Sequence, residues 1–209
     1  MPVAARLLYR WHRMLALACL ACGRSQAAVR RFDTMLACAP GDRHALASRA
    51  HLLAQAGRTA AAVSDLRALT ASHAGDAAAW FNLGFLLQST GDDGQAEAAL
   101  LRALDLDATL DRAWYGLALL HIRARRFDDA ALALQRNTRL QPMSPFGWYQ
   151  LARVQLDRRR PDEALKIIRH LKGFEPRVAA QLERETGLHA QPLARSASIR
   201  SRGRWATSA

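Results

Sequence analysis

The stretch AWFNLGFLLQSTG, residues 79–91, has the composition of one helix, with a tryptophan near its start and a glycine at its end. Its Trp80 is followed by Trp114 in RAWYGLALL and by Trp148 in GWYQLARV, and both intervals are 34 residues. A constant interval of this length indicates a structural repeat, in which each unit places the same residue type at the same point. The division of the chain follows from these tryptophans.

Alignment of the chain on itself at this interval gives five units, which are residues 9–42, 43–76, 77–110, 111–144 and 145–178. The place that we call the tryptophan position holds His12, Leu46, Trp80, Trp114 and Trp148. Four residues later every unit has a small residue, namely Ala16, Ala50, Gly84, Ala118 and Ala152. Sixteen residues after the tryptophan position every unit has an alanine, namely Ala28, Ala62, Ala96, Ala130 and Ala164.

These repeated residues are those that a pair of packed helices needs. The tryptophan and the residue three places after it share one face of a first helix. The small residue allows a second helix, with its alanine, to pack closely against the first. Gly23, Gly57 and Gly91 fall at the turn between the helices, where a positive φ is expected. Arg125 and Arg159 occupy that place in the fourth and fifth units.

The pattern resembles the tetratricopeptide repeat family, whose unit of 34 residues is a helix–turn–helix with the motif W-x-x-L-G-x-x-Y, then A-x-x-x-F, then P. The third unit matches this motif at Trp80, Gly84 and Ala96, whereas Arg49 replaces the leucine in the second unit. The resemblance covers residues 9–178. It implies an all-α fold, an α-solenoid of antiparallel helix pairs.

Three segments lie outside the predicted array. We expect residues 1–8 to be an N-terminal lead-in and residues 179–186 to form a short C-terminal capping helix that covers the last unit. No acidic residue follows Glu185, and the arginines of the remaining tail are Arg195, Arg200, Arg202 and Arg204. We interpret residues 187–209 as a basic disordered tail.

The net charge of +12 is carried almost wholly by arginine, since Lys166 and Lys172 are the only lysines. Such a charge favours acidic partners, nucleic acid or anionic membranes. Arginine in place of lysine is also what a GC-rich genome produces, so the charge alone does not identify a nucleic-acid-binding protein. Cys19 and Cys22 form a single C-x-x-C pair, which we interpret as helix packing rather than as a zinc or haem site.

The N-terminus allows two interpretations. The basic segment MPVAARLLYRWHR precedes the apolar run MLALACLAC, and in one interpretation residues 1–22 are the signal of a periplasmic or membrane-anchored protein. The repeat offers the other, because Leu15, Ala16 and Cys19 stand where a first helix places core residues. The apolar run is too short to span a bilayer. We favour the second interpretation and expect an uncleaved, cytoplasmic chain.

The sequence lacks the common motifs of catalysis, since it has no P-loop, no G-x-G-x-x-G, no G-x-S-x-G and no H-E-x-x-H. The histidines are dispersed, and the two histidines His44 and His51 by themselves make a poor metal site. Paired acids at the start of the second helices favour the helix dipole, which is a structural role. We therefore predict that the protein is not an enzyme and has no cofactor or bound metal.

The resemblance implies that the first helices line a concave groove that holds a peptide or a partner helix. The register directs ten side chains into this groove, namely Phe81, Asn82, Phe85, Arg112, Tyr115, Arg123, Phe146, Tyr149, Gln150 and Arg153. Aromatic and arginine side chains are enriched at binding hot spots. We expect a protein or peptide partner with apolar and acidic residues rather than nucleic acid or a membrane, and membrane contact through the N-terminus stays open.

Three functions compete on these features. The first is a non-catalytic adaptor or scaffold that binds a partner peptide or helix in the groove, and the sequence favours it. The second is an exported or membrane-tethered assembly factor for a bacterial envelope machine, such as a pilus, secretion or polysaccharide system, and it rests on the N-terminus. The third is a basic protein that binds nucleic acid or an anionic surface, and it rests on the charge and the tail.

Overall fold

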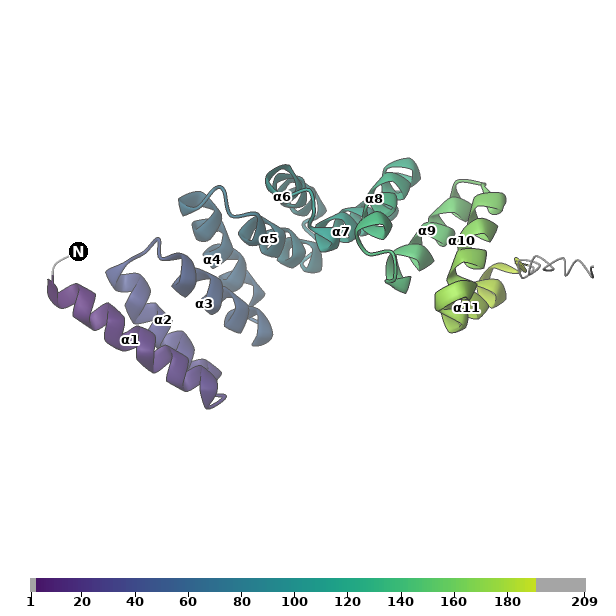
Figure 1. The fold of residues 1–209 in the computed structure, drawn as a ribbon. Helices are drawn as coiled ribbons and strands as arrows, with labels where there is room; N and C mark the ends of the chain where they lie inside the picture. Colours follow the sequence, from purple (N-terminus) through teal and green to yellow (C-terminus); the bar gives the residue numbers. More distant parts are fainter. Residues whose placement is uncertain (1–2, 191–209) are drawn as a thin grey trace, which may run out of the picture.

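The structure is a computed structural model that describes residues 3–190, and this part of the chain contains eleven helices and no strand. The helices follow one another as an elongated array of antiparallel pairs, with α1 at one end and α11 at the other (Figure 1). The predicted all-α solenoid is confirmed. The five pairs are α1 (Val3–Ala21) with α2 (Ser25–Cys38), α3 (Arg43–Gln55) with α4 (Thr59–Ser72), α5 (Ala77–Ser89) with α6 (Asp93–Leu106), α7 (Asp111–Arg123) with α8 (Phe127–Leu140), and α9 (Pro145–Asp157) with α10 (Pro161–Phe174), and α11 (Pro176–Thr186) follows them.

The turn within each pair has the same hydrogen bonds in all five units. In the second unit the backbone N–H of Arg58 donates to the carbonyl of Leu53 at 2.8 Å, and the N–H of Gly57 donates to that of Ala54 at 3.0 Å. This is the Schellman arrangement, which requires a left-handed residue after the helix. Gly57 has a φ of +72°, and Arg125 and Arg159 reach +57° and +58° in the equivalent place. Two arginines therefore adopt a backbone conformation that favours glycine.

The tryptophans have a role beyond packing. The ring N–H of Trp114 donates to the carbonyl of Ala108 at 2.9 Å, six residues earlier in the loop between two units. Trp80 and Trp148 do the same with the carbonyls of Ala74 and Pro142, at 2.9 and 2.8 Å. The rings are half-buried. A tryptophan at this interval therefore fills the space between helices and also fixes the loop that joins one unit to the next.

Small residues set the distance between helices. A Cβ on Gly84 would lie 2.8 Å from Cγ of Leu100, within the same unit. A Cβ on Gly147 would lie 2.1 Å from Oδ1 of Asn137, on the second helix of the preceding unit. Side chains of ordinary size at either place would force the helices apart.

Polar side chains join each unit to the next. Asp42 caps α3 by accepting from the backbone N–H of Ala45 at 2.7 Å, and it also accepts from the hydroxyl of Tyr9 on α1 at 2.8 Å. Asp76 caps α5 and pairs with Arg43 of the preceding unit at 2.6 Å. The residues that begin first helices therefore also position them on the unit before.

Arg49, the largest departure from the repeat, is paired on both sides. Its guanidinium makes two hydrogen bonds to the carboxylate of Asp65, at 2.6 and 2.8 Å, and a third to Asp33 at 2.6 Å. The Asp65 side chain is buried, and it occupies the place that holds Ala99, Ala133 and Ile167 in the next three units. The second unit thus replaces an apolar contact between its helices with an ion pair that also reaches the first unit.

Both ends of the array differ from the expected boundaries. The helix α1 begins at Val3, so residues 3–8 are part of the first helix and not a separate lead-in. The helix α11 begins at Pro176, three residues before the expected start, because Glu175 alone connects it to α10. Leu188 and Ala190 pack against the second core cluster, so the tail does not begin at residue 187. Residues 191–209, most of the predicted tail, lie outside the described residues.

Among residues 3–190, no helix combines the length and the apolar character that crossing a membrane requires.

Exchange of the Arg49–Asp65 pair for the apolar residues of the other units tests the role of this ion pair. Arg49→Leu alone leaves the buried Asp65 carboxylate without its partner, and we expect it to lower the free energy of unfolding by about 3 kcal/mol. Arg49→Leu with Asp65→Ala recreates the contact of the later units and should return to within about 1 kcal/mol of the parent protein. Urea denaturation measures both, and equal losses in the two variants would contradict this account.

A glycine at the turn of the fifth unit should stabilise the protein. Arg159→Gly removes a side chain held at a positive φ, and we expect a gain of about 1 kcal/mol in the free energy of unfolding. Arg160→Gly removes the same charge at a φ of −117° and is the matched control. It should lower stability by about 0.5–1 kcal/mol, because glycine loses more backbone entropy on folding. A shift of the same sign in both variants would assign the effect to charge.

Candidate functional site

A hollow of about 300 Å³ opens between α3, α5 and α7, on the side of the array formed by first helices. We call it the α3–α5–α7 hollow. Its walls come from three successive units, and its lining residues are Ala47, Ala50, His51, Ala54, Leu66, Phe81, Asn82, Phe85, Leu86 and Arg112. Four of the ten side chains predicted to face a groove therefore meet in one depression.

The hollow exists because α3 carries small side chains where its neighbours carry large ones. Ala47 directly follows the tryptophan position, and the equivalent residues of the next three units are Phe81, Tyr115 and Tyr149. Ala54 occupies another such place, which holds a glutamine, an isoleucine and a leucine in the later units. The small side chains at these two positions can be recognised only when the units are aligned with one another.

Apolar and polar side chains lie side by side in the hollow. The Arg112 guanidinium lies 5.1 Å from the centre of the Phe81 ring, a cation–π contact that holds its charge at the wall. The ring of Phe85 lies 6.3 Å from that of Phe81 and is 53% exposed. The Asn82 amide is exposed and makes no hydrogen bond within residues 3–190. No Asp or Glu lines this hollow.

A second depression of about 270 Å³, the α7–α9 hollow, lies between the next two first helices. Among the predicted residues it contains Arg123, Gln150 and Arg153. The guanidinium of Arg123 forms an ion pair with Asp93 on α6 at 2.6 Å, and this pair connects two neighbouring units. Asp157 also lines this hollow, so its charge is mixed. It is the more polar of the two depressions.

Tyr149 is hydrogen-bonded to α11. Its hydroxyl donates to the carboxylate of Glu185 on α11 at 2.6 Å. This hydrogen bond raises the pKa of Tyr149, and together with one from Gln181 it lowers the pKa of Glu185. The Arg153 guanidinium lies over the same tyrosine ring, 5.7 Å from its centre. An acidic side chain of α11 therefore already lies at this end of the first-helix side.

The two remaining predicted residues lie apart from both hollows. Tyr115 is half-buried and packs against the second core cluster, so it belongs partly to the joint between units. Phe146 is 70% exposed at the start of α9 and lines neither depression. The residue register predicts the side of a helix, and contacts with neighbouring units decide which side chains remain accessible.

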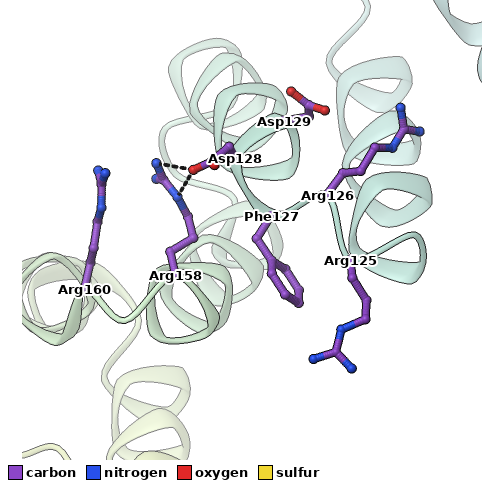
Figure 2. Close-up of a pocket in the computed structure, with 7 residues that line it drawn as sticks. All are labelled: Arg125, Arg126, Phe127, Asp128, Asp129, Arg158 and Arg160. Carbon is purple, nitrogen blue, oxygen red and sulfur yellow. Dashed lines mark hydrogen bonds and ion pairs between the residues drawn. The ribbon is translucent and has the colours of Figure 1, made fainter.

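The turns of the fourth and fifth units form another depression, at the edge of the array (Figure 2). Four arginines line it, but Arg158 pairs with Asp128 at 2.7 Å and Arg126 pairs with Glu97. Figure 2 shows Arg125 and Arg126 pointing away from each other. Ion pairs between units engage two of the four arginines, and Asp128 and Asp129 also line the depression, so its charge is mixed.

Paired acids at the start of second helices also serve these joints. Asp93 accepts a hydrogen bond from Arg123, and Asp128 accepts one from Arg158 in the following unit.

His121, near these ion pairs, is buried. Burial is the largest cause that lowers the pKa of His121, and the positive charge of Arg126 lowers it further. A lowered pKa favours the neutral form of this buried ring.

Side chains that could hold a metal ion are scattered. Within residues 3–190, no three His, Cys, Asp or Glu side chains come together in a metal-binding group. The three cysteines are free thiols, and Cys19 is half-buried in the first unit while Cys22 is exposed at its turn.

Solved structures with the same fold are numerous. The MamA protein superposes with a TM-score of 0.75 at 18% identity, covering 88% of this chain and 98% of that one. YrrB, described as a tetratricopeptide repeat protein with an unusual peptide-binding site, has a TM-score of 0.72 at 14% identity, with 83% and 90% covered. PilF from Pseudomonas aeruginosa has a TM-score of 0.64 at 20% identity, with 89% and 95% covered. At these identities the likeness establishes the fold.

Sequence comparison identifies the family. No curated protein sequence matches the chain. The tetratricopeptide repeat family model matches residues 48–111, 86–145 and 115–176, which together span more than half of the chain. With the constant interval of the tryptophans and the repeated turn, these matches show that the chain belongs to the tetratricopeptide repeat family.

Proposed function

We propose that the protein is a non-catalytic adaptor that binds a short segment of a partner protein in the α3–α5–α7 hollow. The tetratricopeptide repeat fold supports a protein-interaction role in general. The observation that carries this proposal is the Phe85 ring, 53% exposed in a depression whose wall holds the charge of Arg112 and no acid. An exposed aromatic ring beside an arginine is typical of a binding hot spot.

The chemistry of the hollow defines the segment that fits. An apolar side chain of the partner, aliphatic or aromatic, fills the space above Ala47 and Ala54 and covers the ring of Phe85. A carboxylate next to it pairs with Arg112, which makes no ion pair within residues 3–190. The Asn82 amide can donate to and accept from the backbone of an extended peptide. The preferred ligand is a peptide with one apolar and one acidic residue close together.

The neighbouring features support a peptide over a long helix. The helix α7 borders both hollows, so a segment that leaves the first depression passes Gln150 and Arg153 in the second. Beyond them Glu185 of α11 is bonded to Tyr149, which shortens the accessible surface. The described peptide-binding site of YrrB is a further support for this class of ligand.

Nucleic acid is less well supported than a peptide. Five arginines of the described part, Arg43, Arg49, Arg123, Arg126 and Arg158, are paired with carboxylates. Those charges stabilise joints between units and are not free to neutralise phosphates. The arginines of the C-terminal tail lie outside the described residues, and they enter the proposal only as a control.

Selection from a random peptide library, followed by calorimetry with the enriched peptide, tests the proposal. We expect enriched sequences to pair an apolar residue with Asp or Glu. Phe85→Ser with Arg112→Ser should weaken their binding at least tenfold, since hot-spot side chains each contribute on the order of 2 kcal/mol.

A matched control removes an exposed apolar and an exposed arginine side chain elsewhere. Leu132→Ser with Arg136→Ser replaces one apolar and one arginine side chain by serine on α8, where Leu132 is 63% exposed. This control should bind like the parent protein. Equal affinities of the hollow variant and the parent, both folded by circular dichroism, would place the binding site elsewhere.

A further inference from the structure

The outer face of α1 is the largest run of exposed apolar side chains on any described helix. Leu7 is 62% exposed, Trp11 is 63% exposed and Met14 is 67% exposed. Leu8 and Leu17 are 45% and 44% exposed on either side of them. These positions recur at helical spacing, so they form one stripe along the helix, opposite the buried Ala16. A stripe of this kind marks a surface that is covered in use.

Another repeat unit stacked in the manner of this array does not fit on this face. Trp11 directly precedes the tryptophan position, and the equivalent residues of the other units are the buried Ala45, Ala79, Ala113 and Gly147. At Gly147 even a Cβ would lie 2.1 Å from Oδ1 of Asn137 on the preceding second helix. The joint between units therefore requires a small residue where α1 has its largest side chain. The same argument applies to a second copy that would stack here in the manner of a preceding unit.

The charge of the region identifies the kind of surface that fits. Arg6, Arg10 and Arg13 are exposed and lie three or four residues apart, so they line one border of the apolar stripe. No acidic residue precedes Asp33 in the sequence. Apolar side chains that include tryptophan, bordered by arginines, are typical of helices that lie in the interface of an anionic membrane.

We propose that α1 lies on anionic phospholipid by its outer face, with Trp11 and Met14 in the acyl boundary and the three arginines at the headgroups. The helix rests on the surface and does not cross it. Arg10 and Arg13 stand at the register positions of Arg112 and Phe81, which line the α3–α5–α7 hollow, so this hollow opens beside the membrane. This proposal rests on α1 alone and does not depend on the peptide site.

Flotation with lipid vesicles tests this proposal on the full chain. The probes are vesicles of phosphatidylcholine and vesicles of phosphatidylcholine with phosphatidylglycerol in equal parts. We expect the protein to float with the anionic vesicles and much less with the neutral ones. Trp11→Ser with Met14→Ser should lower the partition coefficient at least tenfold, whereas Trp11→Leu with Met14→Leu should keep most of the binding.

Substitution of the arginines separates their charge from the apolar stripe. Arg6→Ser, Arg10→Ser and Arg13→Ser should each lower binding to anionic vesicles about fivefold, with no effect on the neutral ones. Leu132→Ser with Met143→Ser, which changes two exposed apolar residues outside α1, is the matched control and should bind like the parent protein. Phe85→Ser with Arg112→Ser should also bind vesicles normally, which separates this result from the peptide site.

Three outcomes would overturn the proposal. Vesicle binding that survives Trp11→Ser with Met14→Ser would exclude the α1 face. Binding that disappears when Arg195, Arg200, Arg202 and Arg204 are changed to serine, but not in the α1 variants, would assign it to the tail. A parent protein that is dimeric in sedimentation equilibrium and does not float, with a monomeric Trp11→Ser and Met14→Ser variant, would make this face a contact between two copies.

Discussion

The close approach of neighbouring helices is the constraint on which the rest of this structure depends. Gly84 allows the approach within a unit and Gly147 allows it between units, since added Cβ atoms would lie 2.8 Å and 2.1 Å from the facing side chains. Around these close contacts, the ring N–H of Trp114 donates to the carbonyl of Ala108 in the loop between units. Arg123 and Arg158 donate to carboxylates at the start of the preceding second helices. The hollow beside Phe85 is the place where small side chains leave part of this tight packing unfilled.

Much of the fold could be predicted from the spacing of a few residue types. The interval between Trp80 and Trp114, with a small residue and an alanine at fixed distances, is enough to place five helix pairs. The last helix could not be placed in this way, because the repeat ends there. A single residue, Glu175, connects α10 to α11, whereas the earlier units are joined by loops such as residues 39–42. A pattern with a fixed period does not predict where that period changes.

The site was predictable in part, and the reason lies in the length of the side chains. The register assigns Phe81, Asn82, Phe85 and Arg112 to one side of the first helices, and in the structure these four line one depression. It does not predict that Arg123 turns to Asp93 or that Tyr149 bonds to Glu185, since each partner lies on another helix, at least 30 residues away in sequence. A long polar side chain can reach several partners, and the packing of the helices determines which partner lies within hydrogen-bonding distance. Whether the ten predicted residues bind a partner stays a prediction.

The two ends of the array differ in a way that affects its energetics. At one end α11 covers the last pair of helices, with its own Ala179 and Leu182 buried and charged residues on its outer side. At the other end, no element of residues 3–190 covers Trp11 and Met14. In a linear array each unit is stabilised mainly by its neighbours, so the first pair has a contact on one side only. A ligand that binds only the folded form of α1 thereby raises the free energy of unfolding of that pair. Surface attachment and folding of the first unit are then two aspects of one equilibrium.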